Sequence, residues 1–357
     1  MIIRVILIVI AVLLFGFMIF IHEFGHFFTA KLCGIRVNQF SIGMGPILFH
    51  RQKGETDYEL RLLPIGGFCS MEGEDEGSDD SRAFSNKPVW KRILVIVAGG
   101  VMNLLFGLVL MMLLLGQQRA FSSTTISQFA PNSALQAAGL QKGDTFVSVD
   151  HYRIYGDKDL SFALATADPA SVDIEVMRNG TLHSFPNVKF NMQQVSGKEY
   201  ITLDFYVKPI QKNFGSLIAK SGQDIVSTVR LVWYSLVGML TGRFGFKDMA
   251  GPVGAADAVG QVITAGLKES FVAGLNNVLN IMMMLTVNLG VLNLVPFPAL
   301  DGGKLLFLLI EAVRRRPIRE QYQGMVETIG FCLLMGFMVV ITYSDILRLF
   351  TGKGLGG

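Results

Sequence analysis

The sequence is short of charged residues and of basic clusters. Of its 357 residues, 17% are charged and 51% are hydrophobic, whereas soluble domains usually contain about 25% charged residues. The net charge is only +3, and no run of lysine and arginine is interleaved with aromatic residues as a nucleic-acid-binding face would require. The composition therefore argues against a nucleic-acid partner and favours a polytopic membrane protein.

Cysteine is also scarce. Cys33, Cys69 and Cys332 lie in different segments and form no CxxC pair, so the sequence indicates neither a disulfide framework nor a thiolate zinc site. The first two fall on the side of the membrane that is assigned below to the cytosol, where thiols stay reduced.

Long apolar runs are what the sequence has instead. A helix rises about 1.5 Å per residue and the hydrocarbon core is about 30 Å thick, so about 20 apolar residues can span it. The candidate runs are Val5–Ile21 (continued by Phe24–Ala30), Ile93–Leu115, Val278–Phe297, and Ile329–Tyr343 extended by Gly324–Thr328. The first could instead be a signal peptide with Arg4 as its basic start, but it exceeds the usual ~7–15 apolar residues and no small-x-small site follows. We therefore expect about four transmembrane helices.

Basic residues predict the orientation of these helices. The segment between the first and second runs carries Lys31, Arg36, Arg51, Lys53, Arg61, Arg82, Lys87, Lys91 and Arg92. The segment between the third and fourth runs carries Lys304, Arg314, Arg315, Arg316 and Arg319. Cytosolic loops are enriched in lysine and arginine, whereas long domains translocate largely regardless of charge. Both segments should therefore be cytosolic, and residues 116 to about 270 should lie outside.

The outer segment contains a region that is typical of a small β-rich domain, residues 120–208. Residues 173–178 and 181–185 alternate in polarity around Asn179-Gly180, which is a strong hairpin turn. Residues 133–139 are typical of a short capped helix that ends in glycine. We therefore expect this domain to be inserted between an N-terminal membrane half, residues 1–116, and a C-terminal membrane half, residues 269–357.

A linker, residues 209–268, is expected to connect the β-rich domain to the C-terminal half. Within it, residues 221–240 form an amphipathic to apolar segment. Asp224 and Arg230 favour a helix that lies in the membrane interface over a fifth transmembrane helix.

Two histidines and a glutamate, His22, Glu23 and His26, interrupt the end of the first apolar run. Histidines four residues apart lie on one face of a helix, so both imidazoles can reach one Zn²⁺ at about 2.0–2.1 Å. Glu23 is then placed to take a proton from water at the metal, as in other HExxH hydrolases. If the histidines were only packed, three ionisable groups in an apolar helix would cost several kcal/mol unless paired.

A catalytic zinc usually has a third protein ligand, and Asp301 is the candidate. Two prolines break the helix before it, and two glycines after it allow close backbone approach, as in a segment that lines a cavity at membrane depth. Glu327 is the alternative, but it has no such broken backbone around it. The remaining histidines, His50, His151 and His183, lie in polar segments.

Together these motifs resemble the site-2 protease family of intramembrane zinc metalloproteases, and in particular its bacterial RseP-like branch. The matching segments are HEFGH at 22–26, FSIGMGP at 40–46, LPIGGF at 63–68, KPVWKRILVIVAGGVMN at 87–103, APNSALQAAGLQKGD at 130–144 and NLVPFPALDGG at 293–303. One departure is Gly100, because the family usually has proline after Ala98-Gly99. We expect this change to alter a helix start and its local packing only.

The resemblance implies that His22, His26 and Asp301 are the metal ligands and that Glu23 is the general base. It implies a single PDZ-like domain, residues 120–208, on the outer side of a bacterial plasma membrane, with the active site near the cytosolic face. Asn293 would be either a hydrogen-bond donor to the oxyanion of the reaction or a packing residue between helices.

The resemblance also implies a membrane-associated β-hairpin at about residues 47–71. A strand edge that includes Gly66, Gly67 and Phe68 could accept an unwound substrate segment by β-addition. An ordinary cytosolic hairpin is the alternative, because sequence periodicity does not fix membrane depth.

The implied substrates are single-span membrane proteins, either anti-sigma-factor-like proteins or remnant signal peptides, that a site-1 type protease has already trimmed. The PDZ-like domain would act as a size filter or as a binding module. A divalent-metal transporter is one alternative, but it needs further ligands along its path, and the second and fourth spans offer only Asn103 and Glu327. A non-catalytic scaffold is the other alternative, and it would not need Glu23.

Overall fold

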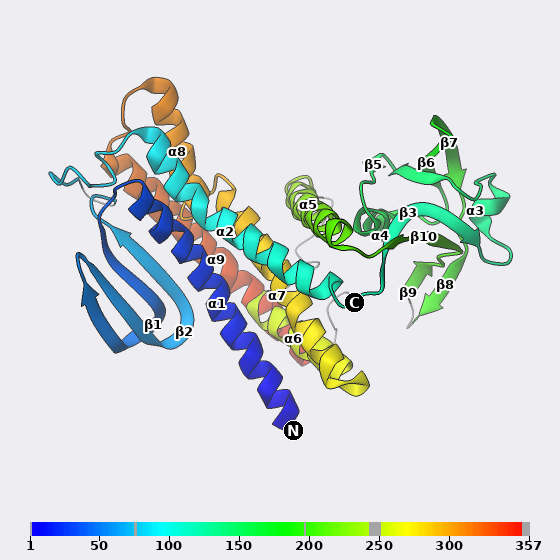
Figure 1. The fold of residues 1–357 in the computed structure, drawn as a ribbon, viewed down its shortest axis with the longest axis horizontal. Helices are drawn as coiled ribbons and strands as arrows, with labels where there is room; N and C mark the ends of the chain where they lie inside the picture. The colour runs from blue at the N-terminus through cyan, green and yellow to red at the C-terminus, as the bar shows by residue number, and fades with distance from the viewer. Residues whose placement is uncertain (1, 75–76, 196–197, 243–250, 352–357) are drawn as a thin grey trace. The chain divides into compact units, whose positions relative to one another are not determined.

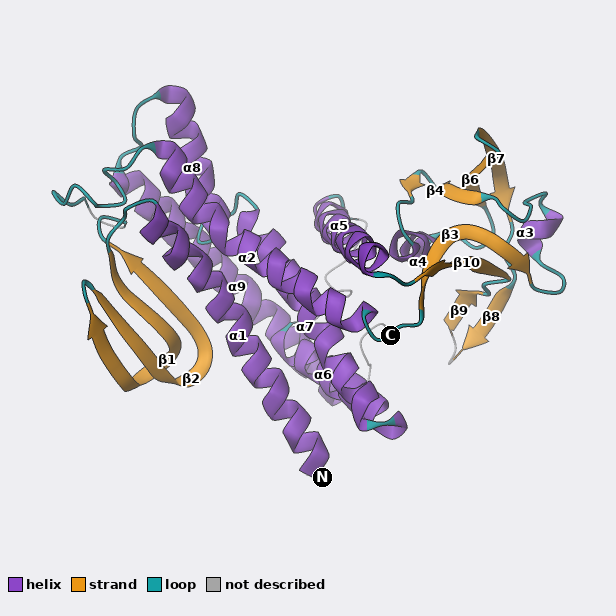
Figure 2. Cartoon of the chain, in the orientation of Figure 1, coloured by secondary structure: helices purple, strands orange, loops and turns teal. Residues whose placement is uncertain are grey.

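The computed structural model describes residues 2–74, 77–195, 198–242 and 251–351. The chain divides into two units, residues 1–110 with 232–357, and residues 111–231. The first unit is mainly helical and carries one two-stranded sheet, whereas strands dominate the second (Figure 2).

Four helices of the described chain are long and apolar enough to cross a membrane: α1 (Ile2–Leu32), α2 (Val89–Leu115), α7 (Phe271–Leu294) and α9 (Glu320–Thr351). This number agrees with the four predicted spans, although α7 and α9 have different bounds. The hydroxyl of Ser270 accepts a hydrogen bond from the Ala273 amide (3.0 Å), so α7 begins earlier than hydropathy indicates. α7 ends before Pro296, because a proline disfavours helical backbone angles at the residue that precedes it.

Three further helices were only partly foreseen. α5 (Phe214–Leu240) contains the predicted amphipathic segment and is not among the four long apolar helices. α6 (Pro252–Glu269) packs against α7 and α9. α8 (Asp301–Arg314) follows the proline-containing break, and the residue after it, Arg315, has a left-handed φ of 55°.

The predicted hairpin is present but longer than residues 47–71. β1 (Val37–Lys53) and β2 (Thr56–Met71) pair antiparallel, with Lys53 opposite Thr56 and Val37 opposite Met71. The sheet lies beside α1 (Figure 1). Its middle part exposes a group of apolar side chains: Met44, Ile47, Leu48, Phe49, Leu60, Leu62 and Leu63. Apolar side chains exposed in this way are typical of a surface that contacts lipid or a partner.

The second unit is built on a sheet whose strand order is β10-β3-β4-β6-β7, with β5 paired to β4. The strands are β3 (Ala120–Phe129), β4 (Thr145–Val149), β5 (Tyr152–Arg153), β6 (Val172–Arg178), β7 (Thr181–Val188) and β10 (Phe205–Gln211). Two helices, α3 (Ala134–Ala137) and α4 (Asp157–Thr166), and a separate pair, β8 (Met192–Val195) and β9 (Lys198–Ile201), complete the unit. Its core includes Leu135, Phe146, Leu160 and Ile174.

Two local predictions for this unit are confirmed. Asn179 and Gly180 have φ of 50° and 82° and join β6 to β7, as the hairpin turn requires. The Ser133 hydroxyl caps α3 by accepting a hydrogen bond from the Gln136 amide. The strands of this sheet-containing region lie between Ala120 and Gln211.

Candidate metal centre

Three potential ligands from distant parts of the sequence meet in the helical unit. His22 and His26 lie on one face of α1, and Asp301 is the first residue of α8. Both histidines are buried, with 7% and 6% of their surface exposed. In the described chain, these three residues form the only cluster of histidine, cysteine and acidic side chains that could hold a metal ion. Glu327 is not part of it.

The ligand atoms form a nearly equilateral triangle. His22 Nε2 lies 3.1 Å from Asp301 Oδ2, His26 Nε2 lies 3.2 Å from the same oxygen, and the two nitrogens are 3.3 Å apart. Tetrahedral zinc with bonds of about 2.0–2.1 Å separates its ligands by about 3.3 Å. Asp301 Oδ2 is buried and has no donor that satisfies hydrogen-bond geometry. Nitrogen, nitrogen and oxygen donors at this spacing fit zinc.

The break between α7 and α8 places Asp301. Val295 is extended, and Ala299 has a left-handed φ of 76°, so the chain reverses before α8 begins. At Gly302 a Cβ atom would lie 1.9 Å from the Val295 carbonyl oxygen, so only glycine permits this approach. As a carboxylate, Asp301 would offer a ligand oxygen to a metal ion.

α2 orients the His26 ring. His26 Nδ1 lies 2.9 Å from the backbone carbonyl oxygen of Val95. A carbonyl can only accept, so Nδ1 carries the proton and Nε2 presents its lone pair toward the ligand triangle. This is the usual way in which a second group fixes a metal-binding histidine.

Asn103 provides the corresponding partner of His22. Its side chain is fully buried, and its amide nitrogen lies 3.2 Å from His22 Nδ1, while its amide oxygen has no partner. Rotating the amide by half a turn makes that oxygen accept from Nδ1–H, which frees Nε2 for metal. Sequence reasoning named Asn103 only as a polar residue of the second span and missed this contact. No sequence signal distinguishes it from a packing asparagine, because its partner lies 81 residues earlier in the chain.

Gly99 lies against both histidines. A Cβ atom on this residue would be 2.3 Å from His26 Nε2 and 2.7 Å from His22 Cε1. The neighbouring Gly100 is in the middle of α2, which runs unbroken from Val89 to Leu115. The expectation that the Ala98-Gly99-Gly100 departure alters a helix start is therefore wrong, because α2 begins about three turns before Gly100.

Asn293, near the end of α7, also reaches the site. Its amide nitrogen lies 3.2 Å from His22 Nε2. Its role, as an oxyanion donor or as a packing residue between helices, stays a prediction.

Glu23 lies beside the ligand triangle and against β2. A Cβ atom on Gly67 would be 3.4 Å from Glu23 Cγ. Nearer the start of α1, Pro64 packs against Gly16. The arm of β2 at residues 64–69 therefore runs along α1 toward Glu23. Burial raises the pKa of the Cys69 thiol, and Cys69 is not in the described cluster that could hold a metal ion.

The other histidines lie elsewhere. His50 is exposed on β1, and its Nε2 is 3.2 Å from Asp57 Oδ1. His151 and His183 belong to the sheet-containing unit.

Comparison with known proteins agrees with this chemistry. The sequence model described as Peptidase family M50 matches residues 10–337. The chain belongs to the M50 peptidases, the site-2 protease family. A Clostridium acetobutylicum protein whose name places it among the zinc metalloproteases is 36% identical, over 95% of this chain and 97% of that protein. The regulator of sigma-W protease RasP of Bacillus subtilis is 29% identical, over 95% and 98%, and zinc metalloprotease RasP of Shouchella clausii is similar to the same degree.

Membership of the M50 peptidases settles the general chemistry. The chain is a zinc-dependent metalloendopeptidase. Its four long apolar helices make it an integral membrane protein, and its peptidase activity is accordingly that of an M50 intramembrane protease.

Proposed function

We propose that His22, His26 and Asp301 ligate one zinc ion and that Glu23 is the general base for hydrolysis of a peptide bond in or near a substrate's transmembrane segment. The triangle of ligand atoms, with sides of 3.1–3.3 Å, carries this proposal. It lies at the end of an apolar helix, where three unpaired ionisable groups would otherwise be strongly unfavourable.

The positions of the side chains suggest which chemical role each group has in the hydrolysis. Bound zinc supplies Lewis-acid polarisation of the scissile carbonyl and activation of water. Glu23 takes the proton from the attacking water and delivers it to the departing amine. The Glu23 side chain packs against β2 at Gly67, where the substrate backbone would lie.

Asn293 is proposed to donate a hydrogen bond to the developing oxyanion. Its amide nitrogen is already close to the His22 ligand atom, at 3.2 Å, and therefore close to where the carbonyl oxygen would be polarised. Packing between helices is the alternative role, and it would leave activity largely unchanged when the side chain is shortened.

The substrate is proposed to dock on the edge of β2 at Gly66, Gly67 and Phe68. A transmembrane helix hides its peptide bonds in its own hydrogen bonds, so it must unwind before cleavage. Residues 67–71 pair with the start of β1 on one side, and no described strand pairs with their other edge. That edge can replace the lost backbone hydrogen bonds by β-addition. The exposed apolar side chains of the hairpin support its insertion into the membrane.

The domain plan and topology are proposed as follows. Residues 1–116 and 269–357 form the two membrane halves, residues 120–208 form a PDZ-like domain, and residues 209–268 form a linker with an interfacial helix. The excess of basic residues on one side supports a cytosolic active site and an outer PDZ-like domain in a bacterial plasma membrane. The domain would bind or exclude substrates by the size of their outer part.

The substrates are proposed to be single-span membrane proteins. The name of the Bacillus subtilis relative, regulator of sigma-W protease, favours an anti-sigma-factor-like protein, and remnant signal peptides are the second class. A site-1 type protease would trim the outer part of the substrate first. A metal transporter would need additional ligands along its path, and the described chain has no second cluster of this kind.

Cleavage of a single-span reporter by the purified protein in detergent tests the proposed function. The wild type should release product, and both a zinc chelator and Glu23→Gln should abolish it. Equal product from wild type and Glu23→Gln would remove Glu23 as the base. Measured zinc content should be the same in both proteins, because Glu23 is not a ligand.

A further inference from the structure

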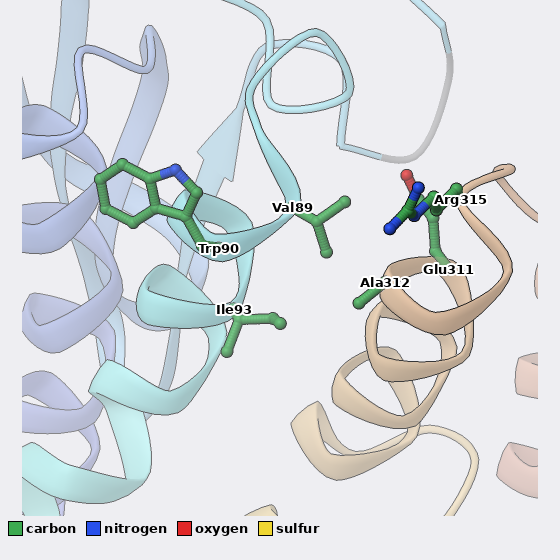
Figure 3. Close-up of a pocket in the computed structure, with 6 residues that line it drawn as sticks. All are labelled: Val89, Trp90, Ile93, Glu311, Ala312 and Arg315. Atoms are coloured by element: carbon green, nitrogen blue, oxygen red, sulfur yellow. The ribbon is translucent and has the colours of Figure 1, made fainter.

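A groove of about 470 Å³ lies between the start of α2 and the end of α8 (Figure 3). Its lining residues are Val89, Trp90 and Ile93 from α2, and Glu311, Ala312 and Arg315 from α8. None of them belongs to the metal centre. The groove therefore has no role in the chemistry described above.

One wall of the groove is apolar, and Glu311, the acidic residue of the lining, is paired with Arg92. Val89 and Ile93 pack on the core cluster that includes Ile96 and Leu308. The carboxylate of Glu311 is buried, and both of its oxygens accept hydrogen bonds from the Arg92 guanidinium, at 3.1 and 2.5 Å. An ion pair of this bidentate kind leaves little net charge. Arg315 is then the lining residue that gives the groove its positive charge.

Arg315 belongs to a run of exposed arginines. Arg314, Arg315 and Arg316 end α8 and follow it, and no described carboxylate forms an ion pair with any of them. The negative end of the α8 dipole accounts for a basic residue in the last turn, such as Arg314. It does not account for the side chain of Arg315 at an apolar groove.

The surface next to the groove is apolar and open. A second hollow of about 290 Å³ on α8 is lined by Leu309, Ile310, Val313 and Arg314. Val313 is 84% exposed, and Trp90 is 59% exposed at the second residue of α2. Because α2 is a membrane-spanning helix, its first residues lie at the level of the lipid headgroups. Tryptophan is enriched at that level.

We propose that this groove is a binding site for an anionic phospholipid. The phosphate would pair with Arg315, and an acyl chain would lie along Val89, Ile93 and Ala312. Basic pockets between transmembrane helices are known to hold anionic headgroups. Charge complementarity at Arg315 and the apolar walls together select an anionic lipid over a zwitterionic lipid and over free phosphate.

Native mass spectrometry of the full-length, delipidated protein in a neutral detergent tests this site. Phosphatidylglycerol should bind more tightly than phosphatidylcholine, and glycerol 1-phosphate at the same concentration should not displace it. Arg315→Asn should weaken phosphatidylglycerol binding about fivefold, which corresponds to about 1 kcal/mol for one basic residue. Asparagine tolerates the left-handed backbone at this position. Ala312→Phe should weaken binding too, because it fills the acyl path without changing charge.

Arg119→Asn is the matched control, because it removes one exposed arginine outside the groove. It should leave phosphatidylglycerol binding unchanged. Equal losses in the two arginine variants would mean general charge attraction and would overturn the proposal. Equal affinity for phosphatidylcholine, or displacement by glycerol 1-phosphate, would overturn it as well. Zinc content should stay constant throughout, so a failure here is independent of the peptidase assignment.

Discussion

Gly99→Ala tests whether the ligand triangle is the metal site. A methyl group on Gly99 would lie 2.3 Å from His26 Nε2 and 2.7 Å from His22 Cε1, whereas ordinary contacts are 3.4–4 Å. The His26 ring cannot move away from Gly99 freely, because its Nδ1 donates a 2.9 Å hydrogen bond to the Val95 carbonyl. Val95 is on α2, as Gly99 is. The new methyl group therefore displaces either the ligand nitrogen or α2 itself.

The size of the effect follows from the required displacement. Restoring ordinary contact moves the imidazole by about 1 Å, whereas zinc sites tolerate only about ±0.2 Å in ligand distance. One of three ligands is lost. Disturbing an outer partner alone weakens metal binding by about 10–100-fold, so Gly99→Ala should weaken zinc binding at least about 100-fold, or about 2.7 kcal/mol.

Competition with a calibrated chelator, together with zinc content after desalting, measures this loss. The matched control is Gly336→Ala, which places the same methyl group on α9, where no atom lies within 4 Å. Alanine stabilises a helix relative to glycine by up to about 1 kcal/mol at either position, so intrinsic helix propensity cancels in the comparison. If Gly99→Ala binds zinc as tightly as Gly336→Ala does, the triangle is not the metal site and the reasoning is refuted.

Three further predictions concern other residues. Asp301→Ala should lose zinc on desalting while keeping the helical content seen by circular dichroism, and unchanged stoichiometry would exclude Asp301 as a ligand. Asn103→Leu should weaken zinc binding about 10–100-fold by chelator competition, whereas Asn103→Asp, which can still accept from the histidine, should bind normally. Burial raises the pKa of Asp144, but its ion pair with Arg178 outweighs burial and holds the pKa below its usual range. The pair should therefore stabilise the sheet-containing unit above about pH 3.9 and lose its effect as the pH falls below that value. Asp144→Asn should cost about 3 kcal/mol at pH 7, measured as faster hydrogen exchange in β6, and an equal effect at pH 3 would contradict this.

The sequence predicts the helical part of the fold well because hydropathy and length are sufficient to find a spanning helix. It gives the ends of these helices poorly. α7 begins at Phe271 because the Ser270 side chain caps it, and hydropathy does not register a hydrogen bond. The hairpin was placed correctly but too short, since β1 begins at Val37. Its first arm pairs with residues 67–71, which lie far along β2.

The residues of the candidate site also differ in how well the sequence predicts them. His22, Glu23 and His26 follow from local spacing, and Asp301 follows from the broken backbone around it. Asn103 does not, because its partner lies 81 residues earlier in the chain and an asparagine in an apolar helix is as consistent with packing. Only the arrangement of α1 against α2 shows that the amide meets an imidazole.

That arrangement depends on close approach between helices. A Cβ atom on Gly25 of α1 would lie 2.5 Å from the Ala98 carbonyl oxygen of α2, and one on Gly100 would lie 2.9 Å from the Gly290 carbonyl oxygen of α7. Small residues at such positions let backbones approach in a membrane, where no hydrophobic force drives helices together. Glycine rather than proline at residue 100 also keeps its N–H, so α2 continues unbroken through the site. Val95 and Asn103, the partners of the two histidines, therefore stand on one rigid helix, and a single rigid helix can set both imidazoles at the spacing that zinc needs.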